Sequence, residues 1–141
     1  MLLTPLIHPQ LAGALAGAGH GATVLIADGN YPMSTGVAAG AEKVYLNLTP
    51  GCLSVNAILG PILQTVAVES AAVMVPEDGA AVAAHREYRE MLPAGLPWNE
   101  FGRFEFYDTA RSANLALAIA SADQRPFANL LLTIGVRPPQ S

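Results

Sequence analysis

Short runs of apolar residues recur along the chain and alternate with more polar segments of helical length. A continuous apolar run of about four to eight residues, rich in branched side chains, is typical of a strand buried on both faces. Apolar strands that alternate with helices indicate an α/β fold with a largely parallel central sheet and helices on both faces. The predicted strands span residues 23–27, 43–48, 70–75, 115–120 and 129–136.

Helix signals lie between these runs. Pro9 suits the first turn of a short helix, and Gly60-Pro61 should bend or interrupt the second helix. Residues 28–42 are rich in Gly, Pro, Asn and Ser, which predicts a loop. The predicted helices span residues 8–19, 54–63 and 77–92, and a further helix begins within 104–114.

The share of charged residues is low for a chain of this size. Only 13% of the 141 residues are charged, whereas 52% are hydrophobic. Charged residues make up about 25% of an ordinary globular domain. We therefore expect a single domain, residues 1–141 with a terminal tail at 136–141, whose apolar surface patches support a homo-oligomer. A monomer with an Ala- and Gly-rich surface is the alternative.

Net charge and cysteine content argue against several partners and locations. The formal net charge is −4 and no Lys/Arg cluster is present, which argues against nucleic acid and anionic membranes as partners. No apolar run approaches the ~20 residues that span a bilayer, and the N-terminus lacks the basic region of a signal peptide. Cys52 is the single cysteine, so we expect a cytoplasmic protein without an intramolecular disulfide.

Common catalytic motifs do not match the chain. The segment GAGHGA precedes a predicted strand, whereas a dinucleotide-binding glycine loop follows one. Three scattered histidines and one cysteine predict no metal site. Ser34 or Cys52 would need a nearby base to act as a nucleophile, and the sequence places none beside them.

A small set of polar residues remains as candidate site residues. His20 lies between two glycines, Asp28 follows a predicted strand, Arg103 precedes an aromatic cluster and Asn129 opens the last strand. Each also has an ordinary structural explanation. His20 would cap the first helix, Asp28 would form an Asx turn, Arg103 would make a surface ion pair, and Asn129 would satisfy backbone groups at a strand edge.

The order of these motifs resembles the RbsD/FucU family of D-ribose pyranases and L-fucose mutarotases. The chain shows Gly-His-Gly, a strand, Asp-x-Asn-x-Pro, Arg-Phe-x-Phe-Tyr and aromatic-x-Asn-x-x-Leu-x-x-Gly-Val in that order. The resemblance implies an α/β sandwich assembled into rings, commonly decamers. It also implies an isomerase that interconverts sugar anomers, or pyranose and furanose forms, without a cofactor.

The resemblance also assigns roles to residues. His20 corresponds to the general acid/base, and Tyr107 is an additional candidate sugar contact. The segment RFEFY at residues 103–107 is similar to the L-fucose mutarotase branch, with ribose pyranase activity as the alternative. The residues expected to hold the monosaccharide are Asp28, Arg103, Phe127, Ala128 and Asn129.

Three departures from the family pattern bear on activity. Phe127 stands where the family usually has tyrosine, which favours a non-catalytic sugar-binding or structural ring as a rival hypothesis. Asp123 stands where a Gly-Glu pair is usual, and the segment KVYLNLTPGCL replaces a characteristic Arg-Ala-Asp-Gly stretch.

The spacing of His20 and Asp28 poses a geometric question. The strand between them, residues 23–27, would be roughly 17 Å long. The two side chains can share a sugar if the chain before residue 23 folds back along the sheet, or if neighbouring subunits each supply one of them. The low charge favours the second arrangement, a site at a subunit interface.

Overall fold

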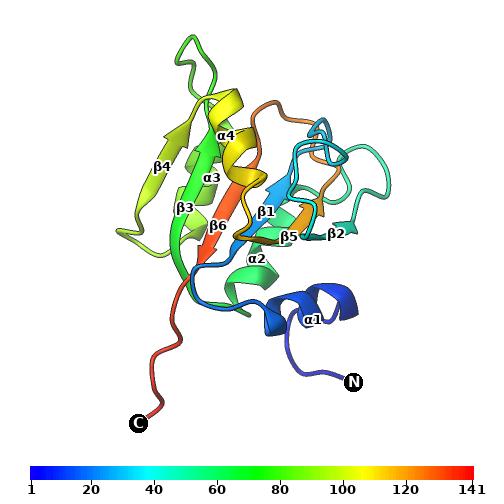
Figure 1. Ribbon diagram of the computed structural model, residues 1–141, viewed down its shortest axis with the longest axis vertical. Helices are drawn as coiled ribbons and strands as arrows, with labels where there is room; N and C mark the ends of the chain where they lie inside the picture. Colours follow the sequence, from blue (N-terminus) through cyan, green and yellow to red (C-terminus); the bar gives the residue numbers. More distant parts are fainter.

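Six strands form one mixed sheet in the computed structural model, which describes residues 1–141 (Figure 1). Their order across the sheet is β2-β5-β1-β6-β3-β4. Five strands run in the same direction, and β6 is antiparallel to both of its neighbours, so the sheet is largely parallel as predicted. The strands are β1 (Thr23–Ala27), β2 (Glu42–Tyr45), β3 (Val68–Met74), β4 (Trp98–Phe101), β5 (Leu115–Ala120) and β6 (Leu130–Ile134).

Helices cover both faces of the sheet, which confirms the predicted architecture. Alternate side chains of β1 enter two separate cores, because successive residues of a strand point to opposite faces. Val24 and Ile26 pack with α1, α2 and α3, whereas Leu25 and Ala27 pack with α4 and the loop that follows β1. Figure 1 shows α4 in front of the sheet and α2 behind it. The helices are α1 (Pro9–Gly17), α2 (Val55–Leu63), α3 (Ala83–Met91) and α4 (Arg103–Ala110).

Local sequence explains where α1 and α2 begin. His8 caps α1 by accepting the Leu11 N–H, and Pro9 occupies the first turn. The Ser54 side chain caps α2 by accepting the Ala57 N–H at 3.2 Å. Of the two effects expected from Gly60-Pro61, a bend or an interruption, the interruption does not occur, because α2 remains helical to Leu63. Pro61 lies in the last turn, where its missing N–H removes a single helical hydrogen bond.

The structure differs from the predicted elements near α3. The helix begins at Ala83, later than the predicted residue 77, because residues 77–82 form an exposed turn around Gly79, whose φ is +71°. Strand β4 was not predicted. It is an edge strand that pairs only with β3, and its residues are partly or fully exposed, so it lacks a continuous apolar run.

The chain ends lie at one end of the molecule (Figure 1). Residues 135–141 have no regular secondary structure. No helix combines the length and the apolar character that crossing a membrane requires.

Candidate functional site

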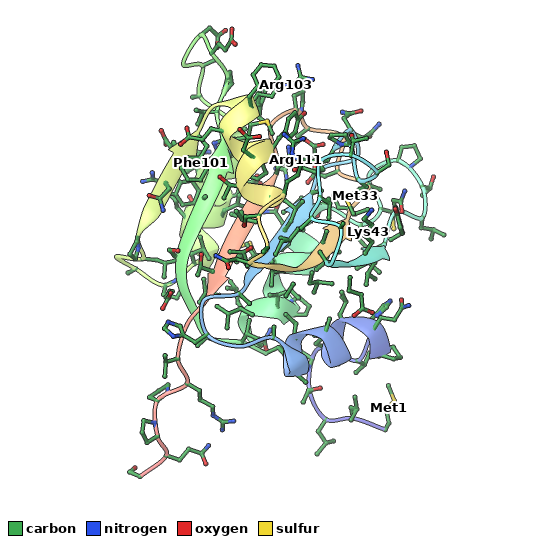
Figure 2. All side chains as sticks on the ribbon, in the orientation of Figure 1. Met1, Met33, Lys43, Phe101, Arg103 and Arg111 are labelled. Carbon is green, nitrogen blue, oxygen red and sulfur yellow. The ribbon has the colours of Figure 1, made fainter.

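All of the predicted sugar-binding residues gather at one end of the sheet. Asp28 directly follows β1, and Arg103 begins α4 two residues after β4 ends. Residues 127–129 precede β6, which runs opposite to the other strands, so they reach the same end. Figure 2 shows Arg103 at this end, far from Met1. Ligand sites of open α/β sheets commonly lie at the carboxyl ends of the parallel strands.

Asp28 and Asn129 are held together in the interior. The Asp28 N–H donates to Asn129 Oδ1 at 2.7 Å, and both residues are buried. Asp28 Oδ1 also accepts the Asn30 N–H at 2.9 Å, which confirms the Asx turn. Burial raises the pKa of the Asp28 carboxyl, although hydrogen bonds from the Asn30 and Ala128 backbones oppose this effect. The surroundings therefore disfavour the charged form of Asp28, and a further hydrogen-bond donor to the carboxylate would stabilise that form.

Helix α3 fixes the backbone that leads to Asn129. His85 Nε2 lies 2.8 Å from the Phe127 carbonyl oxygen, and Tyr88 Oη donates to the Ala128 carbonyl at 2.7 Å. A carbonyl only accepts, so His85 Nε2 carries a proton. Burial lowers the pKa of His85, which favours the neutral ring. Phe127 has φ +61°, a left-handed conformation that side chains other than glycine adopt only when neighbouring contacts enforce it.

Hydrogen bonds of Arg125 stabilise the loop that connects β5 to residues 127–129. Its guanidinium donates to Asp123 and to Glu87, and it donates to Asn56 Oδ1 at 2.6 Å. Asp123 in turn accepts the Val55 N–H at 3.0 Å. Burial opposes ionisation of Asp123, but the hydrogen bonds from Arg125 and Val55 outweigh it and hold the Asp123 pKa below its usual value. The sequence marked Asp123 as a departure but gave no signal for Arg125.

An aromatic cluster supports Arg103. Its Nε donates to Tyr107 Oη at 3.2 Å, and its guanidinium lies 5.6 Å from the centre of the Tyr107 ring. Tyr107 packs edge-on against Tyr31 with ring centres 5.4 Å apart. Tyr31 follows Asp28 closely, so this pair joins α4 to the Asp28 loop. The structure thus shows no ion pair for Arg103 and leaves its remaining N–H groups exposed. Sequence reasoning missed Tyr31.

A polar pocket of about 500 Å³ opens beside Asp28. It lies between the loops that follow β1, β2 and β5. Its polar lining includes Asn30, Asn47, Thr49, Ser121, Asp123 and Gln124. The amide and hydroxyl groups among these side chains both donate and accept hydrogen bonds, as sugar hydroxyls do.

His20 lies at the other end of β1. Its Nε2 is 2.8 Å from Glu69 Oε2, at the start of β3. Strand β1 pairs in parallel with β5 from Thr23 to Ala27, so its full length separates His20 from Asp28. The chain before Thr23 does not fold back along the sheet, because the Gly21 N–H donates to the carbonyl of Ile134 at the end of β6. One subunit therefore does not bring His20 to the Asp28 end.

The ordinary structural explanation is wrong for His20 and is confirmed for Asn129. Helix α1 is capped at Ala18 and not by His20, so that alternative is wrong. Asn129 does satisfy a backbone group, as expected, but it is the N–H of Asp28. No group of three or more His, Cys, Asp or Glu side chains is arranged to hold a metal ion.

Comparison with known proteins gives a consistent family match. A sequence model of the RbsD / FucU transport protein family matches residues 1–137. The chain is 32% identical over 137 residues to the D-ribose pyranase of Streptomyces avermitilis, covering 93% of this chain and 95% of the relative. It is 31% identical over 147 residues to the fucose mutarotase of Bos taurus, covering 96% and 92%. The relatives thus include both named activities at nearly equal identity.

A solved structure has the same fold. Bacillus subtilis RbsD complexed with D-ribose matches with a TM-score of 0.83 at 22% identity, over 98% of this chain and 100% of that chain. At this identity the likeness concerns the fold alone.

Proposed function

The chain belongs to the RbsD/FucU family, and from this membership we propose that it is a monosaccharide mutarotase of the L-fucose type. The observation that carries the proposal is the gathering of Asp28, Arg103 and Asn129 at the carboxyl ends of the parallel strands. The three side chains bring a carboxylate, a planar guanidinium and an amide to the same end of the sheet. This set complements a polyhydroxylated ligand, because each hydroxyl both donates and accepts a hydrogen bond.

The reaction needs only proton transfers. A base removes the proton of the anomeric hydroxyl, C1–O1 becomes a carbonyl, and the C1–O5 bond breaks as O5 takes up a proton. The open-chain aldehyde rotates about its C1–C2 bond, and the reverse steps close the ring on the other face. General acid/base catalysis contributes about 10²–10⁴-fold, which suits a reaction that sugars also undergo unaided. We assign the proton transfers to His20, whose imidazole serves as base and then as acid.

His20 of one subunit would serve the Asp28 end of a neighbouring subunit. Two observations support this shared site. His20 and Asp28 flank opposite ends of the extended β1. Large apolar side chains are also exposed at the sugar-binding end, with Leu48 83% and Phe104 68% accessible. Exposed apolar surface of this kind marks interfaces, so the protein acts as a homo-oligomer, with a closed ring as the expected form.

The substrate and the activity each have an alternative. RFEFY at residues 103–107 favours L-fucose, whereas the similarity to D-ribose pyranases supports pyranose–furanose isomerisation of D-ribose. Phe127 lacks the tyrosine hydroxyl of the family, which favours a non-catalytic sugar-binding ring. The remaining polar set of Asp28, Arg103 and Asn129 favours the enzyme.

The test is saturation-transfer NMR at the anomeric protons of L-fucose, D-ribose and D-galactose. We expect exchange between α and β L-fucose with the wild type and its loss with His20→Ala. His8→Ala is the matched control, because His8 only caps α1, and it should retain exchange. Exchange with D-ribose alone would favour the pyranase. Line broadening without exchange for any sugar would overturn the enzyme assignment, and Phe127→Tyr would then test whether the missing hydroxyl is the cause.

A further inference from the structure

A histidine of α3 anchors the peptide group between Phe127 and Ala128. His85 Nε2 lies 2.8 Å from the Phe127 carbonyl oxygen, and the His85 side chain is buried. Because a carbonyl oxygen only accepts hydrogen bonds, His85 Nε2 carries the proton and is the donor of this bond. The Phe127 carbonyl is therefore directed towards α3.

The direction of this carbonyl fixes the direction of the next N–H. The peptide is trans and planar, so the Ala128 N–H points opposite to the Phe127 carbonyl and away from α3. Asp28 lies on that side, where its own N–H donates to Asn129 Oδ1 at 2.7 Å. Burial raises the pKa of the Asp28 carboxyl, and the hydrogen bond from the Ala128 N–H opposes this rise.

The backbone at Phe127 needs an anchor because it is strained. Its φ is +61°, in the left-handed region, and a residue other than glycine stays there only where its surroundings enforce the conformation. Without the bond to His85, this backbone is free to relax, and the Ala128 N–H then turns away from Asp28. The next carbonyl, that of Ala128, has a separate donor in the Tyr88 hydroxyl at 2.7 Å.

We propose that His85 is a positioning residue of the sugar site, which holds the Phe127–Ala128 peptide so that the Ala128 N–H faces the Asp28 carboxylate. The inference rests on the proposed function, in which Asp28 holds the sugar. The Ala128 N–H fixes the direction of the carboxylate and stabilises its charged form. That form is the one that accepts hydrogen bonds from sugar hydroxyls on its remaining lone pairs. His85 thus acts through the peptide group and not on the sugar itself.

His85 performs this role as a neutral donor. Burial lowers its pKa more than the hydrogen bond to Phe127 and the charge of Glu100 raise it, and Arg89 lowers it further. The imidazole is therefore uncharged near pH 7. A glutamine amide, which is also uncharged and carries N–H donors, reproduces the property that the proposal requires.

A purely structural hydrogen bond is the competing explanation. Buried carbonyl groups are normally paired, and His85 would then do no more than satisfy one of them. Loss of such a bond lowers the stability of the fold but leaves the Asp28 carboxyl and the affinity for sugar unchanged. The two explanations therefore differ in measurements other than stability.

The experiment compares wild type with His85→Met, His85→Gln and Arg86→Gln. Methionine and glutamine have nearly the same shape, but only glutamine offers an N–H donor to the Phe127 carbonyl. The pair of variants at position 85 therefore separates the hydrogen bond from the packing of the side chain. Arg86 is exposed on the same helix and is the matched control.

NMR titration of the aspartate carboxyl groups measures the pKa of Asp28 directly. Asp28→Asn identifies its signal among those of carboxyl-¹³C-labelled Asp28, Asp78, Asp108 and Asp123. We expect a higher Asp28 pKa in His85→Met than in wild type, and no change in His85→Gln or Arg86→Gln. In the wild type, the ¹H shift of the Ala128 amide should follow the Asp28 titration, and this result does not depend on the folding of any variant at position 85.

Steady-state kinetics with the most active sugar test the consequence for binding. KM of His85→Met should rise roughly tenfold with kcat nearly unchanged, because the misplaced carboxylate binds the sugar in the ground state and the transition state alike. His85→Gln should restore the KM of the wild type.

The outcomes separate this inference from the proposed function. An unchanged Asp28 pKa in His85→Met, an equal rise in His85→Gln, or an Ala128 amide that does not follow the Asp28 titration overturns the role of His85. An unchanged KM of His85→Met in an active enzyme overturns it as well. A wild type inactive on every sugar overturns the mutarotase assignment, and the titrations still decide whether His85 positions the peptide beside Asp28.

Discussion

Asp28 and Asn129 are 101 positions apart in the chain, yet the Asp28 N–H donates to Asn129 Oδ1 at 2.7 Å. This bond ties the end of β1 to the start of the antiparallel β6. It also uses the amide oxygen of Asn129 for structure, so the amide NH₂ group is the part that is left to hold a ligand. Asn129 therefore holds the backbone of Asp28 in place, and its NH₂ group adds a hydrogen-bond donor beside the Asp28 carboxylate.

Asn129→Ala should destabilise the protein because the buried Asp28 N–H loses its acceptor. Leaving a buried donor unsatisfied costs about 1–3 kcal/mol, so the free energy of unfolding should fall by that amount in urea denaturation. Asn99→Ala is the control, since Asn99 is exposed on the edge strand β4, and its effect should stay within about 0.5 kcal/mol. Equal stability of the two variants would show that water replaces the lost acceptor.

Asp28→Asn should change the pH dependence of stability. Burial raises the pKa of Asp28 in the folded protein above its ordinary value of 3.8. The folded state therefore binds this proton more tightly than the unfolded chain does, and the associated stability is lost as the pH rises through the raised pKa. Asparagine has no such loss, so the stability of Asp28→Asn relative to wild type should increase as the pH rises above 3.8.

Urea denaturation of both proteins across this range measures the difference directly. Sugar binding should weaken about 10- to 100-fold in the same variant, because a hydrogen bond to a charged group is lost. A stability difference that is constant with pH would contradict the raised pKa. Unchanged sugar affinity would remove Asp28 from the binding set.

Tyr88→Phe should release the backbone beside Asn129 without opening a cavity. The variant removes only the hydroxyl that donates to the Ala128 carbonyl at 2.7 Å, which leaves a buried acceptor unpaired at a cost of about 1–3 kcal/mol. Hydrogen exchange should show faster opening of residues 127–129 than of β5. Tyr45→Phe is the control, because Tyr45 is 58% exposed. Exchange rates that change equally in both segments would indicate global destabilisation.

The strands that were predicted with the correct bounds are those that are buried on both faces of the sheet. Strands β1 and β5 are buried on both faces, so their sequences TVLIA and LALAIA are continuously apolar and give the observed bounds. Edge strand β4 has exposed residues and no such run. The predicted start of α3 was too early because a polar, Ala-rich turn has the same composition as the first turn of an amphipathic helix.

The candidate site was likewise predicted only in part. Asp28 follows a predicted strand, so a parallel sheet was enough to place it at the carboxyl ends of the strands. Arg103 and Asn129 reach the same edge for reasons that the sequence did not reveal, because Arg103 follows the unpredicted β4 and Asn129 precedes the antiparallel β6. The contacts of His85 and Tyr88 with the backbone at 127–128 have no sequence signature, because His and Tyr on a helix usually pack in the core. The His20–Glu69 pair depends on β6 lying between β1 and β3, which hydrophobic periodicity does not encode.

A mixed oligomer of His20→Ala and Asp28→Ala subunits should recover activity that neither variant has alone. If each site takes His20 from one subunit and Asp28 from its neighbour, random assembly gives both intact residues in roughly a quarter of the sites. The two variants are co-expressed with different affinity tags, and the doubly tagged oligomer is purified and measured by anomeric exchange. Each variant alone, purified in the same way, is the control.

Recovery follows from the position of the two residues at opposite ends of β1, which no movement of a side chain can bridge. A site within one subunit would always lack one of the two groups in this mixture, so the mixed oligomer would remain as inactive as its parents. Sedimentation velocity shows whether mixed assemblies form. Inactive mixed oligomers of normal size would therefore contradict the shared site.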